Sequence, residues 1–117
     1  MIAVAAHIPI YLATRPVDFR KGMDGLAAYV EGEFELKAFS GAVFVFRNRG
    51  ATSVKIIQWD GTGLVLVTKR LEAGNFVWPA MRDGTLRLSR SQFEALFEGL
   101  DWTRVRARDV RAPEAAA

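Results

Sequence analysis

The sequence contains no cysteine and one histidine, His7, among its 117 residues. Disulfide bonds and thiolate metal sites are therefore excluded, and a histidine-based zinc site would need aspartate or glutamate for its other ligands. Membrane-spanning runs are also lacking, because Lys, Arg or Asp interrupts every apolar stretch. We therefore expect a protein of a reducing, cytoplasmic compartment with no membrane partner.

The composition is that of a globular protein with a basic bias. Half of the residues are hydrophobic and 25% are charged. The net charge of +3 and the pI of about 9.7 favour nucleic acid or acidic partners only mildly. We expect one domain over residues 1–103, followed by an Arg-rich, poorly ordered tail at 104–117 that ends in Pro113 and an alanine run.

Three apolar runs joined by short turns predict an antiparallel β-meander: Gly41–Arg47, Val54–Trp59 and Leu64–Arg70. The first run is apolar on both faces, which is typical of a central strand. The turn Asp60-Gly61-Thr62-Gly63 places Trp59 opposite Leu64 and Ile57 opposite Leu66.

One helix is expected before the meander and one after it, which gives an α+β fold. The first follows Pro16, with Asp18 as its N-cap. The second spans Ser89–Glu98, with a capping box of Ser89 and Gln92 and a stop at Gly99. Their predicted apolar faces are Phe19, Met23, Leu26, Ala27 and Val30, and Phe93, Leu96, Phe97 and Leu100.

Shorter elements complete the predicted fold. Ile8–Ala13 is expected to be a strand at an edge, because it contains Pro9. Phe76–Trp78 is expected to be a short strand, and Thr85–Leu88 to pair at an edge. Two glycines in the first helix, Gly22 and Gly25, allow two explanations: close packing on the sheet, or close approach by the backbone of a partner.

The acidic residues do not form a catalytic pattern. A metal-dependent nuclease or transposase core needs several carboxylates that converge on two cations. The candidates are Asp18, Asp24, Asp60, Asp83 and Asp101. No three of them fall on adjacent expected strands, and no Walker loop or Ser–His or Cys–His pair is visible. The sequence therefore predicts no enzyme activity, no catalytic residue, no metal site and no cofactor.

Basic residues cluster where the expected strands end. From Gly41 to Arg70 there are five basic residues and one acid. Together with two cations at the expected start of the first helix, they make seven candidate nucleic-acid-binding residues, here called the basic rim: Arg20, Lys21, Arg47, Arg49, Lys55, Lys69 and Arg70.

Other interpretations of these residues stay open. Lys and Arg at strand ends also protect a sheet from edge pairing, and Arg20 or Lys21 could pair with Asp24 at a solvated helix start. Trp59, Trp78 and Trp102 could stack on bases or belong to the core. A further basic group, Arg104, Arg106, Arg108 and Arg111, fits either an extended basic arm or a solvated tail.

Four segments resemble those of a known family, and they cover nearly the whole chain. They are PVDFRKGMDGLAAYV (16–30), FSGAVFVFRNR (39–49), VKIIQWDGTGLVLVTKRLEAGNFVWP (54–79) and FEGLDW (97–102). In this order they resemble TnpB, the small accessory proteins encoded by the second reading frame of bacterial insertion sequences of the IS sixty-six family. The resemblance implies a role in DNA transposition beside a separate, larger transposase, and it supplies no catalytic residues.

Two hypotheses of function follow from the residues and the resemblance. In the first, the chain is an accessory protein that binds DNA through the basic rim. In the second, it is an adaptor that docks on the transposase or on another accessory protein of the same element, and its basic residues only keep it soluble. A steep salt dependence of DNA binding would distinguish the first from the second.

Overall fold

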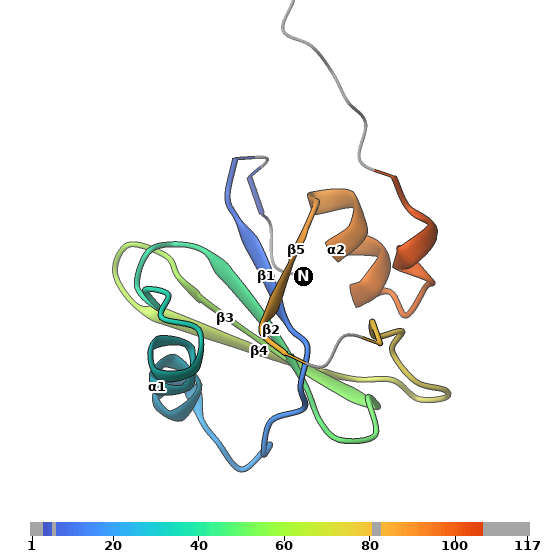
Figure 1. Cartoon of the computed structure of the whole chain (residues 1–117), viewed down its shortest axis with the longest axis horizontal. Coiled ribbons are helices and arrows are strands. Elements are labelled where there is room, and N and C mark those ends of the chain that lie inside the picture. The colour runs from blue at the N-terminus through green and yellow to red at the C-terminus, as the bar shows by residue number, and fades with distance from the viewer. Residues whose placement is uncertain (1–3, 6, 81–82, 107–117) are drawn as a thin grey trace, which may run out of the picture.

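The computed structural model describes residues 4–5, 7–80 and 83–106. Within these residues a five-stranded sheet has the order β4-β3-β2-β1-β5 and carries two separate helices (Figure 1). The elements are β1 Ile10–Ala13, α1 Met23–Glu33, β2 Val43–Arg47, β3 Ser53–Trp59, β4 Leu64–Arg70, β5 Thr85–Leu88, α2 Arg90–Phe97 and a 3₁₀ turn η1 Trp102–Arg104. Helix α1 precedes the meander and α2 follows it, so the predicted α+β class is confirmed.

The meander β2–β3–β4 has the predicted register. Trp59 lies opposite Leu64 and Ile57 opposite Leu66. The hairpin turn is held by Asp60, whose Oδ1 accepts hydrogen bonds from the backbone N–H groups of Thr62 (3.0 Å) and Gly63 (2.9 Å). The alternation that predicted these strands also fixes which of their side chains share a face.

Strand β2 lies at the centre of the sheet and is buried on both faces, as predicted. Phe44 and Phe46 pack in one core with Leu26, Ala27 and Val30 of α1. Val43 and Val45 pack in a second core with Phe93 and Leu96 of α2. Because successive strand residues point to opposite faces, the two helices cover opposite faces of the sheet.

Strand β1 is not at an edge, so that prediction was wrong. It lies between β2, to which it is parallel, and β5, to which it is antiparallel. Pro9 precedes the first paired residue, and its carbonyl accepts a hydrogen bond from the N–H of Val43 (2.9 Å). Pro9 therefore removes no hydrogen-bond donor from the pairing of β1 with its neighbours. The edge position is taken by β5, as predicted for Thr85–Leu88.

Helix α1 begins later than predicted. Its N-cap is Gly22, and Asp18 instead accepts a hydrogen bond from the N–H of Arg20 (2.9 Å) within the preceding turn. The explanation that Gly22 and Gly25 allow close packing of the helix on the sheet was also wrong. Apart from its chain neighbours, a Cβ on Gly22 would meet no described atom within 4 Å, and the atoms nearest to a Cβ on Gly25 belong to the side chain of Lys21.

Helix α2 has the predicted capping box, and Gly99 (φ 83°) follows its end. Two predictions for the segments on either side of α2 were wrong. Phe76–Trp78 is not a strand but an irregular segment, tied to the neighbouring turn through the Phe76 N–H and the Ala51 carbonyl (2.7 Å). Leu100 is 55% exposed because the chain turns away after Gly99.

The predicted tail is described only in part. Arg104 belongs to η1, where its Nε lies 3.4 Å from a carboxylate oxygen of Asp101. Residues 107–117, with Arg108 and Arg111, lie outside the described residues. Among the helices that are described, none is long and apolar enough to span a membrane.

Candidate nucleic-acid interface

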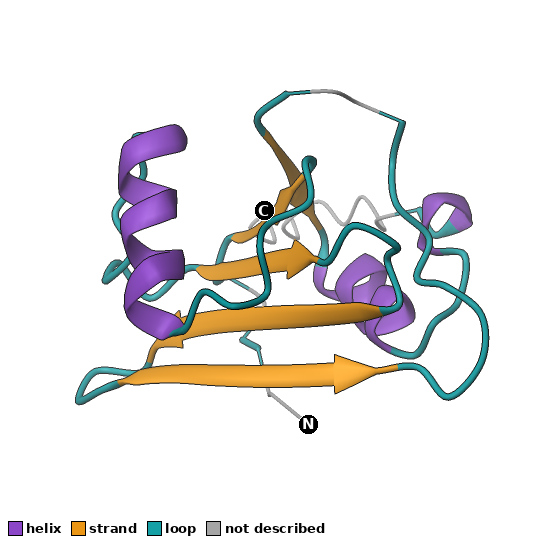
Figure 2. Ribbon diagram, turned by 90° about the horizontal axis from the view of Figure 1, so that it is seen from below, coloured by secondary structure: helices purple, strands orange, loops and turns teal. Residues whose placement is uncertain are grey.

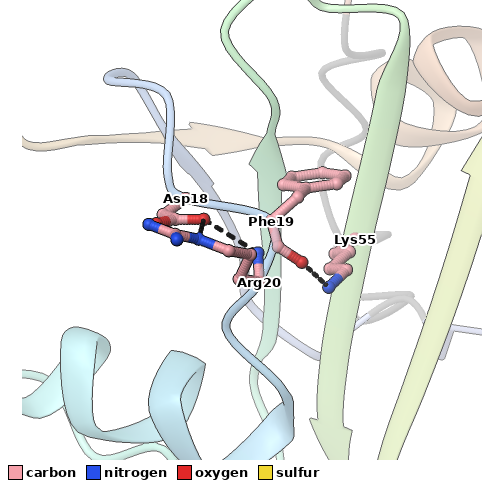
Figure 3. Close-up of polar contacts among 4 residues, drawn as sticks. All are labelled: Asp18, Phe19, Arg20 and Lys55. Atoms are coloured by element: carbon pink, nitrogen blue, oxygen red, sulfur yellow. Dashed lines mark hydrogen bonds and ion pairs between the residues drawn. The ribbon is translucent and has the colours of Figure 1, made fainter.

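The segment that precedes α1 is fixed to the sheet by Lys55 of β3. The Lys55 Nζ donates hydrogen bonds to the carbonyl oxygens of Phe19 (2.7 Å) and Lys21 (2.9 Å), and Figure 3 shows the first of these contacts. The same ammonium group lies 4.9 Å from the centroid of the Phe19 ring. Lys55, a predicted rim residue, is thus engaged inside the protein and positions the backbone that carries Arg20 and Lys21.

Arg20 forms a two-point ion pair with Asp18. Its Nη2 lies 2.6 Å from Oδ2, and its Nε lies 3.0 Å from the same oxygen. The hydrogen bonds from Arg20 lower the pKa of the Asp18 carboxyl from 3.8 to about 2. The Arg20 side chain is 91% exposed, so its outer edge faces solvent although its charge is partly balanced.

The turn between β2 and β3 presents Arg49, and Asn48 builds that turn. The Asn48 Oδ1 accepts hydrogen bonds from the N–H groups of Thr52 (2.9 Å) and Ser53 (3.1 Å), and its Nδ2 donates to the Thr52 hydroxyl (2.8 Å). Sequence reasoning placed Asn48 in this turn but gave it no role, although Asn side chains often bond to nearby backbone groups in turns.

A shallow cleft joins this turn to the segment before α1. Its volume is about 360 Å³, and its lining residues are Pro16, Val17, Asp18, Phe19, Asn48 and Arg49. The cleft therefore brings Arg49 to the same end of the sheet as the Asp18–Arg20 pair.

Four of the seven predicted residues lie at this end of the sheet. Arg70 lies opposite Ser53, two residues from Lys55, which in turn contacts the Lys21 carbonyl. Arg49 and Arg70 are exposed, Lys21 is half-buried, and none of these three side chains makes a hydrogen bond or ion pair with a described residue. We call this group the outer rim cations: Arg20, Lys21, Arg49 and Arg70.

Arg47 is not one of them, because it lies on the other face of the sheet. Its guanidinium carbon is 5.7 Å from the centroid of the Trp78 ring, and its Nη1 donates to the Arg49 carbonyl (3.1 Å). Burial lowers the pKa of the Arg47 guanidinium. Its Nε is buried and has no hydrogen-bond partner among the described residues. Arg47 supports the turn that presents Arg49.

Lys69 also faces the α2 side. Its Nζ donates to the carbonyl of Phe97 (2.6 Å), the last residue of α2, and lies 4.6 Å from the centroid of the Phe97 ring. A cation at the C-terminal end of a helix satisfies a carbonyl left without an intrahelical partner and interacts favourably with the helix dipole. Lys69 thus fastens α2 to the sheet.

The three tryptophans lie away from the outer rim cations or inside the protein. Trp102 is 3% exposed and donates through Nε1 to the Val77 carbonyl (2.7 Å). Trp78 is half-buried and donates to the Ala13 carbonyl (2.9 Å). Trp59 ends β3 at the hairpin and packs edge-on against Phe39, with ring centroids 5.5 Å apart. Trp59 is partly exposed, and Phe39 is 52% exposed, so this pair offers an aromatic surface to solvent.

Three of the aspartates considered as catalytic candidates have structural partners in the described part of the chain. Asp18 pairs with Arg20, Asp60 closes the hairpin, and Asp83 forms an ion pair with Arg15. No group of three His, Cys, Asp or Glu residues in the described part of the chain could hold a metal ion. The arrangement offers cations and a shallow cleft, and the chemistry that it supports is the binding of anions.

Comparison with known proteins agrees with the resemblance seen in the sequence. Residues 8–107 match the family model described as IS66 Orf2 like protein. The uncharacterized protein y4jC of Sinorhizobium fredii is 43% identical over 117 residues, which are 100% of both chains. The uncharacterized protein y4hO of the same organism is 37% identical over 102 residues, 87% of this chain and 89% of the other. No solved structure matches the chain.

Proposed function

Because the chain belongs to the family of IS66 Orf2 like proteins, we propose that it is a non-catalytic accessory protein of DNA transposition that contacts DNA phosphates through the outer rim cations. It assists a separate transposase of the same element, and it works in the cytoplasm, where that DNA is found. The family supports the association with transposition. The contact with DNA is the part that the geometry supports.

The proposal rests on how the seven predicted cations divide between those that contact the protein itself and those that remain at its surface. Lys55, Lys69 and Arg47 are turned toward carbonyl oxygens and aromatic rings of the protein itself. The remaining four come from three separate parts of the chain and meet at one end of the sheet. Cations that share a surface and make few contacts with the protein are suited to phosphate contacts, which carry affinity without sequence preference.

Titration of DNA binding with salt tests the proposal. Contacts from four cations would give a slope of about −3.6 in log affinity against log salt for a duplex of arbitrary sequence. The triple variant Lys21→Glu, Arg49→Glu, Arg70→Glu should weaken binding to all sequences alike and flatten this slope. Arg90→Glu is the control for each single reversal, because Arg90 is exposed in the first turn of α2, on the opposite face. Equal affinity of the triple variant and the control would refute the DNA contact.

A second candidate function, that of an adaptor, is favoured by one observation. Phe39 is 52% exposed and packs on Trp59 at the hairpin end of the sheet, far along β3 from the rim. Exposed aromatic residues are enriched where proteins bind one another. In this case Phe39→Ser would abolish capture of the transposase by the purified protein, while the triple rim variant would leave capture intact and DNA binding would be absent.

A further inference from the structure

Strand β4 leaves one side of the sheet open. It is the outermost strand at the bottom of Figure 2, and no described element lies beyond it. It is seven residues long, whereas β5, the strand at the other edge, has four. The open edge is therefore the longer of the two.

The ladder with β3 determines which backbone groups of β4 point outward. One hydrogen bond lies beyond each end of the ladder. The Asp60 N–H donates to the Gly63 carbonyl (3.0 Å), and the Leu71 N–H donates to the Thr52 carbonyl (3.0 Å). In an antiparallel pair, bonded and non-bonded residue pairs alternate. Counting from either flanking bond, Val65, Val67 and Lys69 belong to the hydrogen-bonded pairs with β3.

Four residues then direct their N–H and carbonyl groups away from the sheet: Leu64, Leu66, Thr68 and Arg70. Within the described part of the chain no donor or acceptor meets these groups. A row of such groups on an extended strand is a template for pairing with another strand.

The edge also lacks most of the features by which natural sheets prevent pairing. Such features are Pro, bulges, short strands and charged side chains. The register of β4 with β3 is continuous from Leu64 to Arg70, so there is no bulge. Its first four residues are Leu, Val, Leu and Val, all partly exposed, and its charges are confined to Lys69 and Arg70 at the end.

We propose that β4 pairs antiparallel with β4 of a second copy of this chain, with the two-fold axis at Val67. This register sets Leu64 opposite Arg70 of the second copy and Leu66 opposite Thr68. All four outward residues of each strand then enter bonded pairs, and each such pair exchanges two hydrogen bonds. A shift by two residues in either direction leaves outward groups of at least one residue without a partner.

The side chains fit a second copy of the same strand. In this register Val67 meets Val67, and Lys69 meets Val65. No cation lies directly opposite another cation, which would be unfavourable. The apolar stems of Lys69 and Arg70 lie across from Val65 and Leu64, so the charged end of each strand covers the apolar start of the other. This self-complementarity is the reason for assigning the edge to a second copy.

Pairing of this kind has a consequence for the arrangement of the faces. Directly opposite residues of an antiparallel pair point to the same face, so the two-fold axis is perpendicular to the sheet. Both copies of α1 then lie on one face of a continuous sheet, and both copies of α2 lie on the other. The inference does not depend on the proposed DNA contact.

The first test compares two threonine-to-proline variants by sedimentation equilibrium of the full chain. Wild type should have twice the mass of the monomer at micromolar concentration. Thr68→Pro removes an outward N–H of β4 and should raise the dissociation constant of the dimer at least about tenfold. Thr85→Pro removes the corresponding N–H at the β5 edge, since Thr14 and Gly84 form the adjacent bonded pair. It should leave the mass unchanged.

The second test does not depend on proline being tolerated. The chain has no cysteine, so Val67→Cys introduces one thiol that faces its own copy across the axis. Non-bonded antiparallel pairs have Cα atoms about 4.5 Å apart, within the range for a disulfide. Mild oxidation should convert Val67→Cys to a covalent dimer and leave Thr85→Cys monomeric. A monomeric wild type, or equal cross-linking of the two cysteine variants, would overturn the proposal. The open edge would then not pair with a second copy, and a strand of a different protein would be the alternative partner.

Discussion

Lys55 and Phe19 are joined at two points. The Lys55 Nζ donates a 2.7 Å hydrogen bond to the Phe19 carbonyl and lies 4.9 Å from the centroid of the Phe19 ring. Its bond to the Lys21 carbonyl is the third contact of the same group. An ammonium group with these partners would have to give them up to reach a phosphate, so Lys55 shapes the rim without being part of its outer surface.

We expect Lys55→Met to lower stability by about 2–3 kcal/mol, because two carbonyl groups lose a charged donor. Chemical denaturation measures this change. Lys37→Met is the control: Lys37 is exposed and its side chain makes no hydrogen bond with a described residue, so its stability should stay within about 0.5 kcal/mol of wild type. If Lys55→Met were as stable as its control, the attachment of the 14–22 segment would not depend on this lysine.

Lys69 and Arg70 are neighbours with opposite expected effects. Lys69→Met should lower stability by about 1–3 kcal/mol, because the Phe97 carbonyl at the end of α2 loses its charged donor. Arg70→Met should leave stability within about 0.5 kcal/mol but weaken DNA binding and reduce the salt slope by about 0.9. Denaturation and DNA titration of both variants measure the two effects. A loss of DNA affinity in Lys69→Met alone would contradict this assignment.

Much of the sheet could be predicted because its signals are local. The alternation in Leu64–Arg70 and the Asp60–Gly63 turn together fix the register of β3 and β4. The same alternation places Lys55 and Lys69 on opposite faces, since Lys55 pairs with Thr68 and Lys69 with Val54. The capping box of α2 is likewise contained in four consecutive residues.

The remaining features depend on contacts between distant segments. Which carbonyl Lys55 reaches depends on the path of residues 14–22, and that path depends on the parallel pairing of β1 with β2. The start of α1 was misplaced because Asp18 had two available partners. Its carboxylate satisfies Arg20 in the turn instead of the helix N-terminus, and the helix then begins after Gly22.

Phe44→Ala should lower stability by about 3–5 kcal/mol, since the ring is 1% exposed and stacks on Tyr11 at 5.5 Å between centroids. Phe39→Ala is the matched control, because Phe39 is 52% exposed, and it should cost less than about 1 kcal/mol. Denaturant midpoints of the two variants measure the difference. Equal losses would mean that the α1-side core is not centred on β2.

The last prediction concerns the acid titration of Asp18. Its pKa of about 2 lies below the ordinary 3.8, chiefly because of the hydrogen bond from the Arg20 side chain. A depressed carboxyl pKa stabilises the folded state above the unfolded pKa, and this contribution is lost as the pH falls through about 2. NMR titration should find the Asp18 carboxyl half-protonated near pH 2, and Arg20→Gln should raise that midpoint while the hydrogen bond from the backbone N–H keeps it below 3.8. Lys37→Gln, with a cation removed elsewhere, should leave it unchanged. An Asp18 midpoint that does not respond to Arg20→Gln would show that the ion pair does not form in solution, and Arg20 would then be available to phosphate without competition.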